Sequence, residues 1–277
     1  LYVLHFPVYR TYLNAAGPTA HDRALIADTI ERARADWFGP DEGLFDFLRE
    51  VLTLDLIKRA RTTHSKRRVR RFALKLQQFT GPTMAKSLED TAFYRYHRLL
   101  ALNEVGGDPA ADALPIDAFH EMMRKRAIDW PHGLTATATH DTKRGEDTRA
   151  RLLALAELPG EWTAAVARWK VLNAPHLTID NTTRAPSAPF EYMLYQTLLG
   201  AWPLQPESDF TARIQAYAQK AAREAKQQTS WLNPHAAYEA GVRGFIERIL
   251  DPGRSGAFID QMQMLAERVA LLGALNS

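Results

Sequence analysis

The sequence contains no cysteine among its 277 residues. This absence excludes disulfide frameworks, thiol nucleophiles and cysteine-ligated zinc. Long apolar runs are also missing, since no stretch approaches the roughly 18 apolar residues that cross a bilayer. The first residues lack the basic region and longer apolar stretch of a signal peptide. The sequence therefore predicts a cytoplasmic protein with no membrane partner.

Several signature motifs are missing as well. The sequence has no Walker loop, no Gly-x-Gly-x-x-Gly after a strand, no His-Glu-x-x-His and no Gly-x-Ser-x-Gly. Nucleotide-binding, zincin and α/β-hydrolase sites therefore lack their residues. The sequence implies no metal and no organic cofactor.

Hydrophobic residues make up 46% of the chain, which is enough for a full buried core, and charged residues make up 24%. The formal net charge of +3 does not by itself select a partner. The basic run from Lys58 to Arg71 could neutralise phosphates. Such a run is more often the solvated face of a helix, so we expect no nucleic-acid partner.

Apolar residues recur at three- and four-residue spacing through most of the sequence, which predicts helices. The first helices are expected over residues 20–38, 44–56, 65–79 and 119–128, the third of them ended by Gly81-Pro82. Further helices are predicted over residues 147–156, 161–173, 188–200, 208–228, 234–250 and 256–272. Residues 1–6 and 133–139 are predicted to be short strands, the second of them buried. The expected fold class is therefore mainly α with a few short β-strands.

Two strands separated by more than a hundred residues cannot form a sheet worth burying. The sequence also begins with Leu1 rather than methionine. We therefore interpret it as a fragment whose missing strands lie outside it. A soft domain boundary is expected near Pro186, which separates residues 1–185 from a C-terminal helical region, residues 186–277.

His140 and Asp141 directly follow the second predicted strand. An imidazole and a carboxylate would then lie at the C-terminal end of a strand, where barrel enzymes place their chemistry. In the structural alternative, Asp141 caps the next helix and His140 is an ordinary surface residue. Spacing alone favours this alternative.

A second polar segment combines adjacent carboxylates with aromatic rings, which suits sugar binding because pyranose faces stack on such rings. Its residues are Glu89, Asp90, Phe93, Tyr94 and Tyr96. In the alternative interpretation, Asp90 begins a helix and the rings belong to the core. The loop with Arg10 and Tyr12 has a similar composition.

Three ordered segments resemble maltooligosyltrehalose synthases of the α-amylase clan: residues 6–12 (FPVYRTY), 81–109 (GPTMAKSLEDTAFYRYHRLLALNEVGGDP) and 136–152 (ATATHDTKRGEDTRARL). Residues 216–235 and 238–250 are similar to helices near the C-terminus of that family. The resemblance implies the C-terminal portion of a (β/α)8 barrel plus a helical domain. It covers nearly the whole chain.

Enzymes of this family are isomerases of trehalose biosynthesis. They convert the reducing-end α-1,4 bond of a maltooligosaccharide into an α,α-1,1 bond by intramolecular transglucosylation. In the clan, an Asp nucleophile, a Glu acid/base and a second Asp that stabilises the transition state carry a retaining mechanism. The resemblance assigns Asp141 as the stabilising carboxylate and His140 as a hydrogen-bond donor to the sugar.

The resemblance further implies a set of substrate-binding residues: Lys143, Arg144, Glu89, Asp90, Phe93, Tyr94, Tyr96, Arg10 and Tyr12. The aromatic loop is expected to exclude water from the covalent intermediate. Because the nucleophile and the acid/base are absent, the chain alone is expected to be inactive and to need the missing N-terminal barrel segment. The alternatives are an inert helical interaction or scaffold module and a basic nucleic-acid-binding module.

Overall fold

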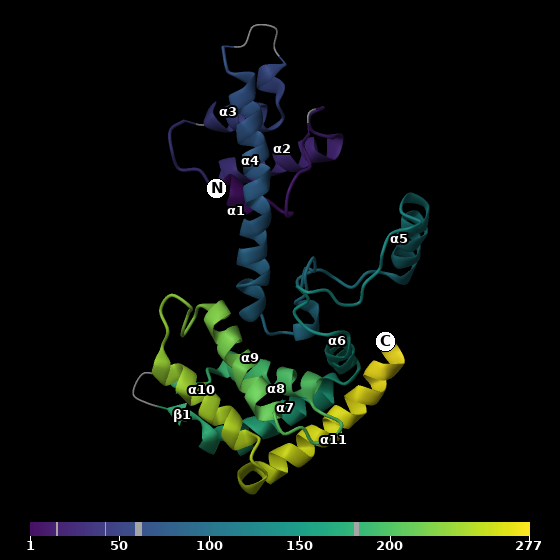
Figure 1. The fold of residues 1–277 in the computed structure, drawn as a ribbon, viewed down its shortest axis with the longest axis vertical. Coiled ribbons are helices and arrows are strands. Elements are labelled where there is room, and N and C mark those ends of the chain that lie inside the picture. The colour runs from purple at the N-terminus through teal and green to yellow at the C-terminus, as the bar shows by residue number, and fades with distance from the viewer. Residues whose placement is uncertain (15, 42, 59–62, 180–182) are drawn as a thin grey trace. The chain divides into compact units, whose positions relative to one another are not determined.

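The computed structural model describes residues 1–277 except 15, 42, 59–62 and 180–182. The described chain divides into two compact units, Leu1–Asp90 and Thr91–Ser277 (Figure 1). The prediction of a mainly α fold with a few short strands is confirmed, because helices dominate and the described strands Thr178–Ile179 (β1) and Arg184–Ala185 (β2) form one small antiparallel pair. The predicted boundary near Pro186 falls inside the second unit.

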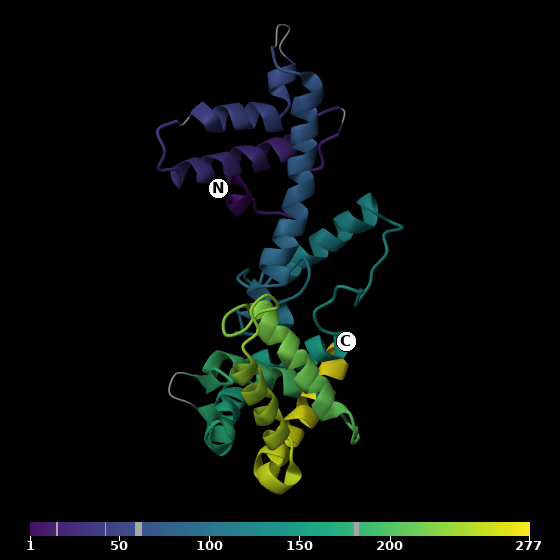
Figure 2. The same cartoon turned by 60° about the vertical axis from the view of Figure 1, so that its left-hand side comes forward.

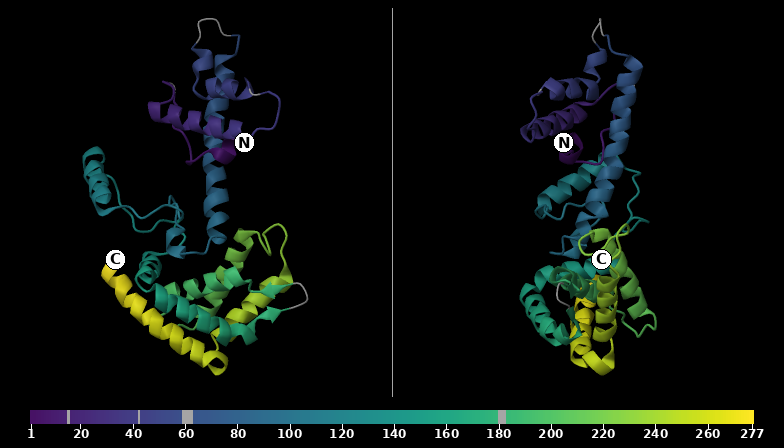
Figure 3. Two further views of the ribbon diagram at one scale, coloured as in Figure 1. Left: turned by 180° about the vertical axis from the view of Figure 1, so that it is seen from behind. Right: turned by 90° about the vertical axis from the view of Figure 1, so that its left-hand side faces the viewer.

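The described residues of the first unit form four α-helices: α1 (Tyr2–His5), α2 (Ala20–Ala35), α3 (Gly43–Leu52) and α4 (Lys66–Met84). A 3-10 turn, Asp55–Ile57, follows α3, and a π-helical turn, Ala85–Glu89, follows α4. Helices α2 and α3 lie side by side and both cross α4 (Figures 2 and 3). Their apolar faces form one buried cluster that includes Ile26, Ile30 and Ala73.

The predicted strand over residues 1–6 is wrong, since this segment contains the short helix α1. Tyr2 and Phe6 are four residues apart, so a helical turn brings them to the same face. Their rings lie 5.6 Å apart, and both are buried in the core of the first unit. Burial of both rings explains why the segment is helical.

The predicted end of α4 at Gly81-Pro82 is also wrong, because Pro82 lies inside the helix and the helix continues to Met84. A proline removes one backbone donor and crowds the preceding turn. The backbone N–H of Ala85 still donates to the carbonyls of Gly81 and Pro82, and the wider π-helical turn begins there. The chain thus leaves α-helical geometry one turn later than predicted.

The buried amide of Gln77 fixes the loop between α1 and α2. Its Oε1 accepts from the backbone N–H of Leu13 at 2.9 Å and from the Thr11 hydroxyl at 3.1 Å. Its Nε2 donates to the carbonyl of Leu13 at 3.1 Å. One side chain therefore satisfies both backbone groups of Leu13, as a neighbouring strand would.

The second unit contains the remaining helices. They are α5 (Ile116–Asp129), α6 (Glu146–Leu153), α7 (Pro159–Asn173), α8 (Ala188–Ala201), α9 (Phe210–Ala225), α10 (Ala236–Ile249) and α11 (Pro252–Asn276). Short 3-10 turns lie at Ala92–Tyr94, Leu100–Leu102, Ala154–Glu157 and Ala174–His176. Every helix predicted after Thr142 is present, with ends shifted by a few residues.

The core of the second unit surrounds α8, which buries ten of its fourteen residues. Trp169 lies 5.5 Å from Tyr195 and 5.6 Å from Phe258, measured between ring centroids, so α7, α8 and α11 share an aromatic cluster. The buried carboxylate of Glu191 pairs with Arg184 and accepts from the Tyr195 hydroxyl at 2.7 Å. These bonds compensate the charge that α8 brings into the core.

The predicted buried strand over residues 133–139 is wrong, because all seven residues are exposed and none is in a strand. An isolated segment has no neighbour to accept and donate ladder hydrogen bonds, so its β-branched composition is not sufficient. His140 and Asp141 therefore do not follow a strand in this structure. Helix α5, which precedes this segment, stands apart from helices α6–α11 (Figures 1 and 3).

Candidate functional site

His140 and Asp141 form the tip of a tight turn. Thr142 N–H donates to the carbonyl of Thr139 at 3.2 Å, and Thr139 N–H donates to the Thr142 hydroxyl at 2.5 Å. The imidazole Nε2 lies 3.3 Å from Oδ2 of Asp141, with the two side chains 91% and 68% exposed. Gly145 is the N-cap of α6, so the alternative in which Asp141 caps that helix does not apply. Both functional groups face solvent.

Glu104 holds the base of this turn. Its carboxylate accepts from the backbone N–H groups of Lys143 at 2.8 Å and Arg144 at 3.2 Å, and also from Val105 at 2.9 Å. Burial raises the pKa of Glu104, but these bonds and the Arg149 guanidinium outweigh it and leave that pKa below its ordinary value. The bonds are therefore charge-assisted at neutral pH.

Arg149, in the first turns of α6, closes the same loop from the other side. Its guanidinium lies 3.3 Å from the Glu104 carboxylate and donates to the carbonyl of Arg144 at 3.1 Å. It also donates to the carbonyl of Thr137. Since Thr137 and Arg144 lie on opposite sides of the His140–Asp141 tip, one side chain ties the two ends of the loop together.

The predicted binding residue Arg144 is held by α9. Its guanidinium donates to the Tyr217 hydroxyl at 2.6 Å and lies 5.8 Å from the centre of that ring. The backbone of Lys143 is fixed by Glu104, and its side chain is half-buried. The contacts of Lys143 and Arg144 therefore hold the end of the turn in place. Their contact with a sugar stays a prediction.

The aromatic residues predicted to bind sugar lie mostly inside the second unit. Phe93 and Tyr94 are buried, and Tyr94 belongs to the hydrophobic core. Tyr96 is half-buried, and its carbonyl and that of Phe93 accept from the Asn103 amide at 2.6 and 2.9 Å. Phe93 and Tyr94 are thus buried as the core interpretation expects, while a sugar contact by any of the three rings stays a prediction.

The other four predicted binding residues lie in the first unit. Glu89 is buried and accepts from the Tyr9 hydroxyl, and Asp90 pairs with the amine of Lys86 at 2.5 Å. The Arg10 guanidinium lies 4.9 Å from the ring centre of Tyr12, a ring that is mostly exposed. Within this unit the structure therefore brings Arg10 and Tyr12 together, and hydrogen bonds hold the carboxylates of Glu89 and Asp90 in place.

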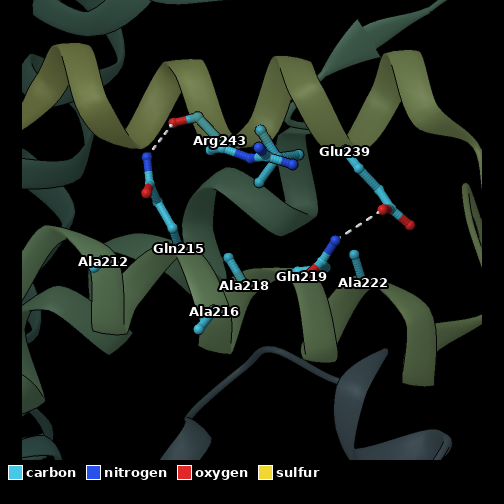
Figure 4. A pocket seen from close by; sticks show the side chains of 9 residues that line it. Ala212, Gln215, Ala216, Ala218, Gln219, Ala222, Glu239 and Arg243 are labelled. Atoms are coloured by element: carbon cyan, nitrogen blue, oxygen red, sulfur yellow. Dashed lines mark hydrogen bonds between the residues drawn. The ribbon is translucent and has the colours of Figure 1, made fainter.

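A hollow of about 310 Å³ lies between α9 and α10 (Figure 4). Gln219 donates to Glu239 at 3.0 Å across it, and Gln215 donates to the backbone carbonyl of Arg243 at 3.1 Å. Bonds from Arg223 lower the pKa of Glu239 to about 2, so this carboxylate stays ionised near neutral pH. Alanines line much of the remaining wall, which offers no group for proton transfer.

The described residues hold neither a metal-binding cluster nor a membrane-spanning helix. Among these residues, no group of three or more His, Asp or Glu side chains is arranged to hold a metal ion. No described helix combines the length and the apolar character needed to cross a membrane.

Glu104 and Arg149 are the site residues that the sequence prediction missed. Glu104 lies in the similar segment 81–109, but it is 39 residues before Lys143, whose backbone it binds. Only the fold shows that the two meet. Arg149 lies in the similar segment 136–152, but its residue type and position do not distinguish it from any other arginine on a short helix.

No family model matches the sequence. Proteins of two Mycobacterium tuberculosis strains, each named putative maltooligosyl trehalose synthase, are 40% identical to it over 181 residues, 65% of this chain and 22% of theirs. The maltooligosyltrehalose synthase of Arthrobacter ramosus has a similar structure, with a TM-score of 0.77 and 31% identity over 98% of this chain and 31% of that one. The resemblance to maltooligosyltrehalose synthases is confirmed.

A third relative has the same fold. The structure of a hypothetical maltooligosyl trehalose synthase from Sulfolobus tokodaii matches with a TM-score of 0.74 and 27% identity, over 98% of this chain and 32% of that one. The mainly helical chain matches the C-terminal part of the synthase structures. It thus spans less than a third of the length of the A. ramosus synthase and 22% of the mycobacterial relatives.

Proposed function

We propose that this chain is part of an isomerase that converts the reducing-end α-1,4 bond of maltooligosaccharides into an α,α-1,1 bond. The observation that carries the proposal is the exposed His140–Asp141 turn, in a chain similar to maltooligosyltrehalose synthases over 98% of its residues. We further propose that the chain contributes the C-terminal portion of a (β/α)8 barrel. The nucleophile and the acid/base would then lie outside its 277 residues.

In this proposal, Asp141 stabilises the positive charge that develops on the sugar ring as the glycosidic bond breaks. A carboxylate that is fixed before the reaction stabilises such charge without reorganising. His140 would donate a hydrogen bond to a hydroxyl of the same sugar. The two groups are exposed and contact one another, so a sugar can reach both from solvent.

Glu104 and Arg149 act as positioning residues in the same proposal. A displacement of about 1 Å between a catalytic group and its substrate can cost about a hundredfold in rate. The turn has few apolar contacts to hold it, since residues 131–141 are all exposed. The polar bonds from Glu104 and Arg149 to its two ends therefore set the place of Asp141.

The test is to fuse this chain to the part of the A. ramosus synthase that it does not match, and to incubate the fusion with maltohexaose. We expect a loss of reducing ends without an equal release of glucose, which distinguishes rearrangement from hydrolysis. Asp141→Asn should lower kcat at least about a hundredfold. Asp129→Asn is the matched control, because Asp129 is also an exposed carboxylate, and it should keep the activity.

Two results would contradict the proposal. A fusion that unfolds cooperatively but leaves the reducing ends of maltohexaose unchanged would contradict the function. A folded Asp141→Asn fusion as active as the Asp129→Asn control would contradict the role of Asp141. The chain alone should form no product, and product from it would show that nucleophile and acid/base lie within these residues.

A further inference from the structure

An apolar groove of about 740 Å³ lies between α3 and α4 of the first unit, and none of the residues that the proposed function uses belongs to this unit. Two aromatic rings contribute to it, Phe47 and Phe72, which are 45% and 50% exposed. Aliphatic side chains form the rest of its apolar lining: Leu44, Leu48, Val51 and Val69. The groove is therefore a hydrophobic surface in contact with water.

Three cations, Arg68, Arg71 and Lys75, border this groove, and no carboxylate among the described residues lines it. They belong to a longer series, because α4 contains six lysines and arginines and no acidic residue. Among the described residues, none of these three side chains forms an ion pair. Residues 59–62 of the basic run from Lys58 to Arg71 lie outside the described residues.

We propose that this groove binds an acidic amphipathic helix of another polypeptide. A helix that lies between two others packs about 8–10 Å from each axis and inserts apolar residues at spacings of three, four and seven. Its flanking carboxylates would meet Arg68 and Arg71, and arginine binds carboxylates through two parallel hydrogen bonds. One occupant thus covers the exposed rings and neutralises the cations.

The chemistry of the lining favours such a peptide over a nucleic acid. Phosphates require cations, which the border supplies, but bases require ring faces or hydrogen-bonding groups. Phe47 and Phe72 offer ring faces, but the aliphatic side chains of Leu44, Leu48 and Val51 offer a base neither ring faces nor hydrogen bonds. Leucine or phenylalanine side chains of a helix would bury these aliphatic groups favourably. The aliphatic lining is the feature that separates the two classes of partner.

The test uses the full chain and a fluorescein-labelled designed peptide of about 20 residues, a length that spans about 30 Å as a helix. Its leucines follow helical spacing and its other positions are mainly glutamate. The comparison peptide has the same composition in scrambled order. Fluorescence anisotropy should show saturable binding of the first peptide, at least about tenfold weaker binding of the scrambled one, and weakening by salt.

Variants of α4 locate the binding. Phe72→Ser and Arg71→Glu should each weaken the peptide at least about tenfold. Their matched controls are Leu74→Ser and Arg70→Glu, which change an exposed apolar residue and a cation that line a different hollow. These controls should change the affinity less than about twofold. Circular dichroism and urea unfolding of each variant confirm that it is folded.

Three outcomes would overturn the proposal. Equal affinity for the ordered and scrambled peptides would show simple charge attraction, and the lack of saturable binding would show no site. The third outcome is tighter binding of a duplex DNA of about 20 base pairs, weakened equally by Arg70→Glu and Arg71→Glu. That result would assign the basic helix to nucleic acid.

Discussion

Helix α8 and helix α5 belong to the same unit but are held in opposite ways. Helix α8 buries ten of its fourteen residues, whereas every residue of α5 is at least partly exposed. The segment from α5 to the His140–Asp141 turn is exposed as well. The helical pack around α8 is thus a scaffold stabilised by apolar burial, while the residues proposed for chemistry lie on a loop anchored by polar bonds.

The sharpest test of this difference is to remove one tryptophan from each region. Trp169→Ala empties a fully buried site against Tyr195 and Phe258, and should lower the free energy of unfolding by about 3–5 kcal/mol. Trp130→Ala removes a ring that is 73% exposed, and should change it by less than about 0.5 kcal/mol. Urea unfolding measures both, and equal losses would contradict the comparison.

Removing one hydroxyl group from each region should give a smaller difference in the free energy of unfolding. Tyr195→Phe removes the 2.7 Å bond to buried Glu191 and the bond that Tyr195 accepts from Asn173 at 3.1 Å. It should cost about 1–3 kcal/mol, because buried groups then lose a partner. Thr142→Val removes the hydroxyl that accepts from Thr139 N–H, but water can replace it at an exposed turn. A loss from Thr142→Val as large as that from Tyr195→Phe would argue that the turn is not solvated.

The scaffold should also show a pH dependence that the exposed segment lacks. Bonds from Arg223 lower the pKa of Glu239 to about 2, from an ordinary value of 4.5 in the unfolded chain. The unfolded chain therefore binds more protons between these values, so stability is present above pH 4.5 and is lost as pH falls through 2. Tm should fall between pH 5 and pH 3, and less steeply in Glu239→Gln. An unchanged slope in this variant would contradict the assignment.

His97 should cause a second, smaller loss of stability, which begins at a higher pH. Burial lowers the pKa of His97 below its ordinary value of 6.5, although the carbonyls of Tyr94 and Pro189, which accept hydrogen bonds from the ring, act to raise it. The unfolded chain again binds more protons, so stability should decline as pH falls below 6.5. Tm between pH 7.5 and pH 5.5 should fall less in His97→Gln, while the exposed His140→Gln serves as control and should match the parent chain. Equal slopes in all three chains would refute the assignment.

The smallest effect on stability is expected at the anchor of the turn. Glu104→Ala removes the acceptor for Lys143 and Arg144 N–H, both in half-buried residues, and should cost about 1 kcal/mol or less. Its larger consequence should be local, with faster tryptic cleavage after Lys143 and Arg144. Glu121→Ala on α5 changes an exposed acid paired only with Arg124 in this structure, and should leave that cleavage unchanged. Slow cleavage in both variants would mean that Glu104 does not hold the turn.

The helices after Thr142 were predictable because long periodic segments are separated by prolines that begin helices, as Pro159 and Pro252 do. The short segments were not. Tyr2 and Phe6 fit a helical face as well as a strand, and only their burial against α2 decides between the two. Residues 133–139 have the composition of a strand, but composition cannot supply the neighbour that a strand needs.

The candidate site also has one part that could be predicted from the sequence and one that could not. Its tip, His140 and Asp141, could be found from the sequence, because the resemblance depends on those residues themselves. Its anchors could not, since Glu104 and Arg149 bind the backbone groups of residues 137, 143 and 144, which nearly every residue type at these positions would supply. Burial of Tyr94 likewise depends on helices more than fifty residues away in sequence.

Native-state hydrogen exchange compares the two regions most directly. The amides of α8 should exchange only through global unfolding, with a protection that matches the free energy from urea. The amides of residues 131–141 should exchange orders of magnitude faster, apart from slower positions at the hydrogen-bonded turn. Protection of residues 131–138 equal to that of α8 would contradict the distinction between a buried scaffold and a loop held by Glu104 and Arg149.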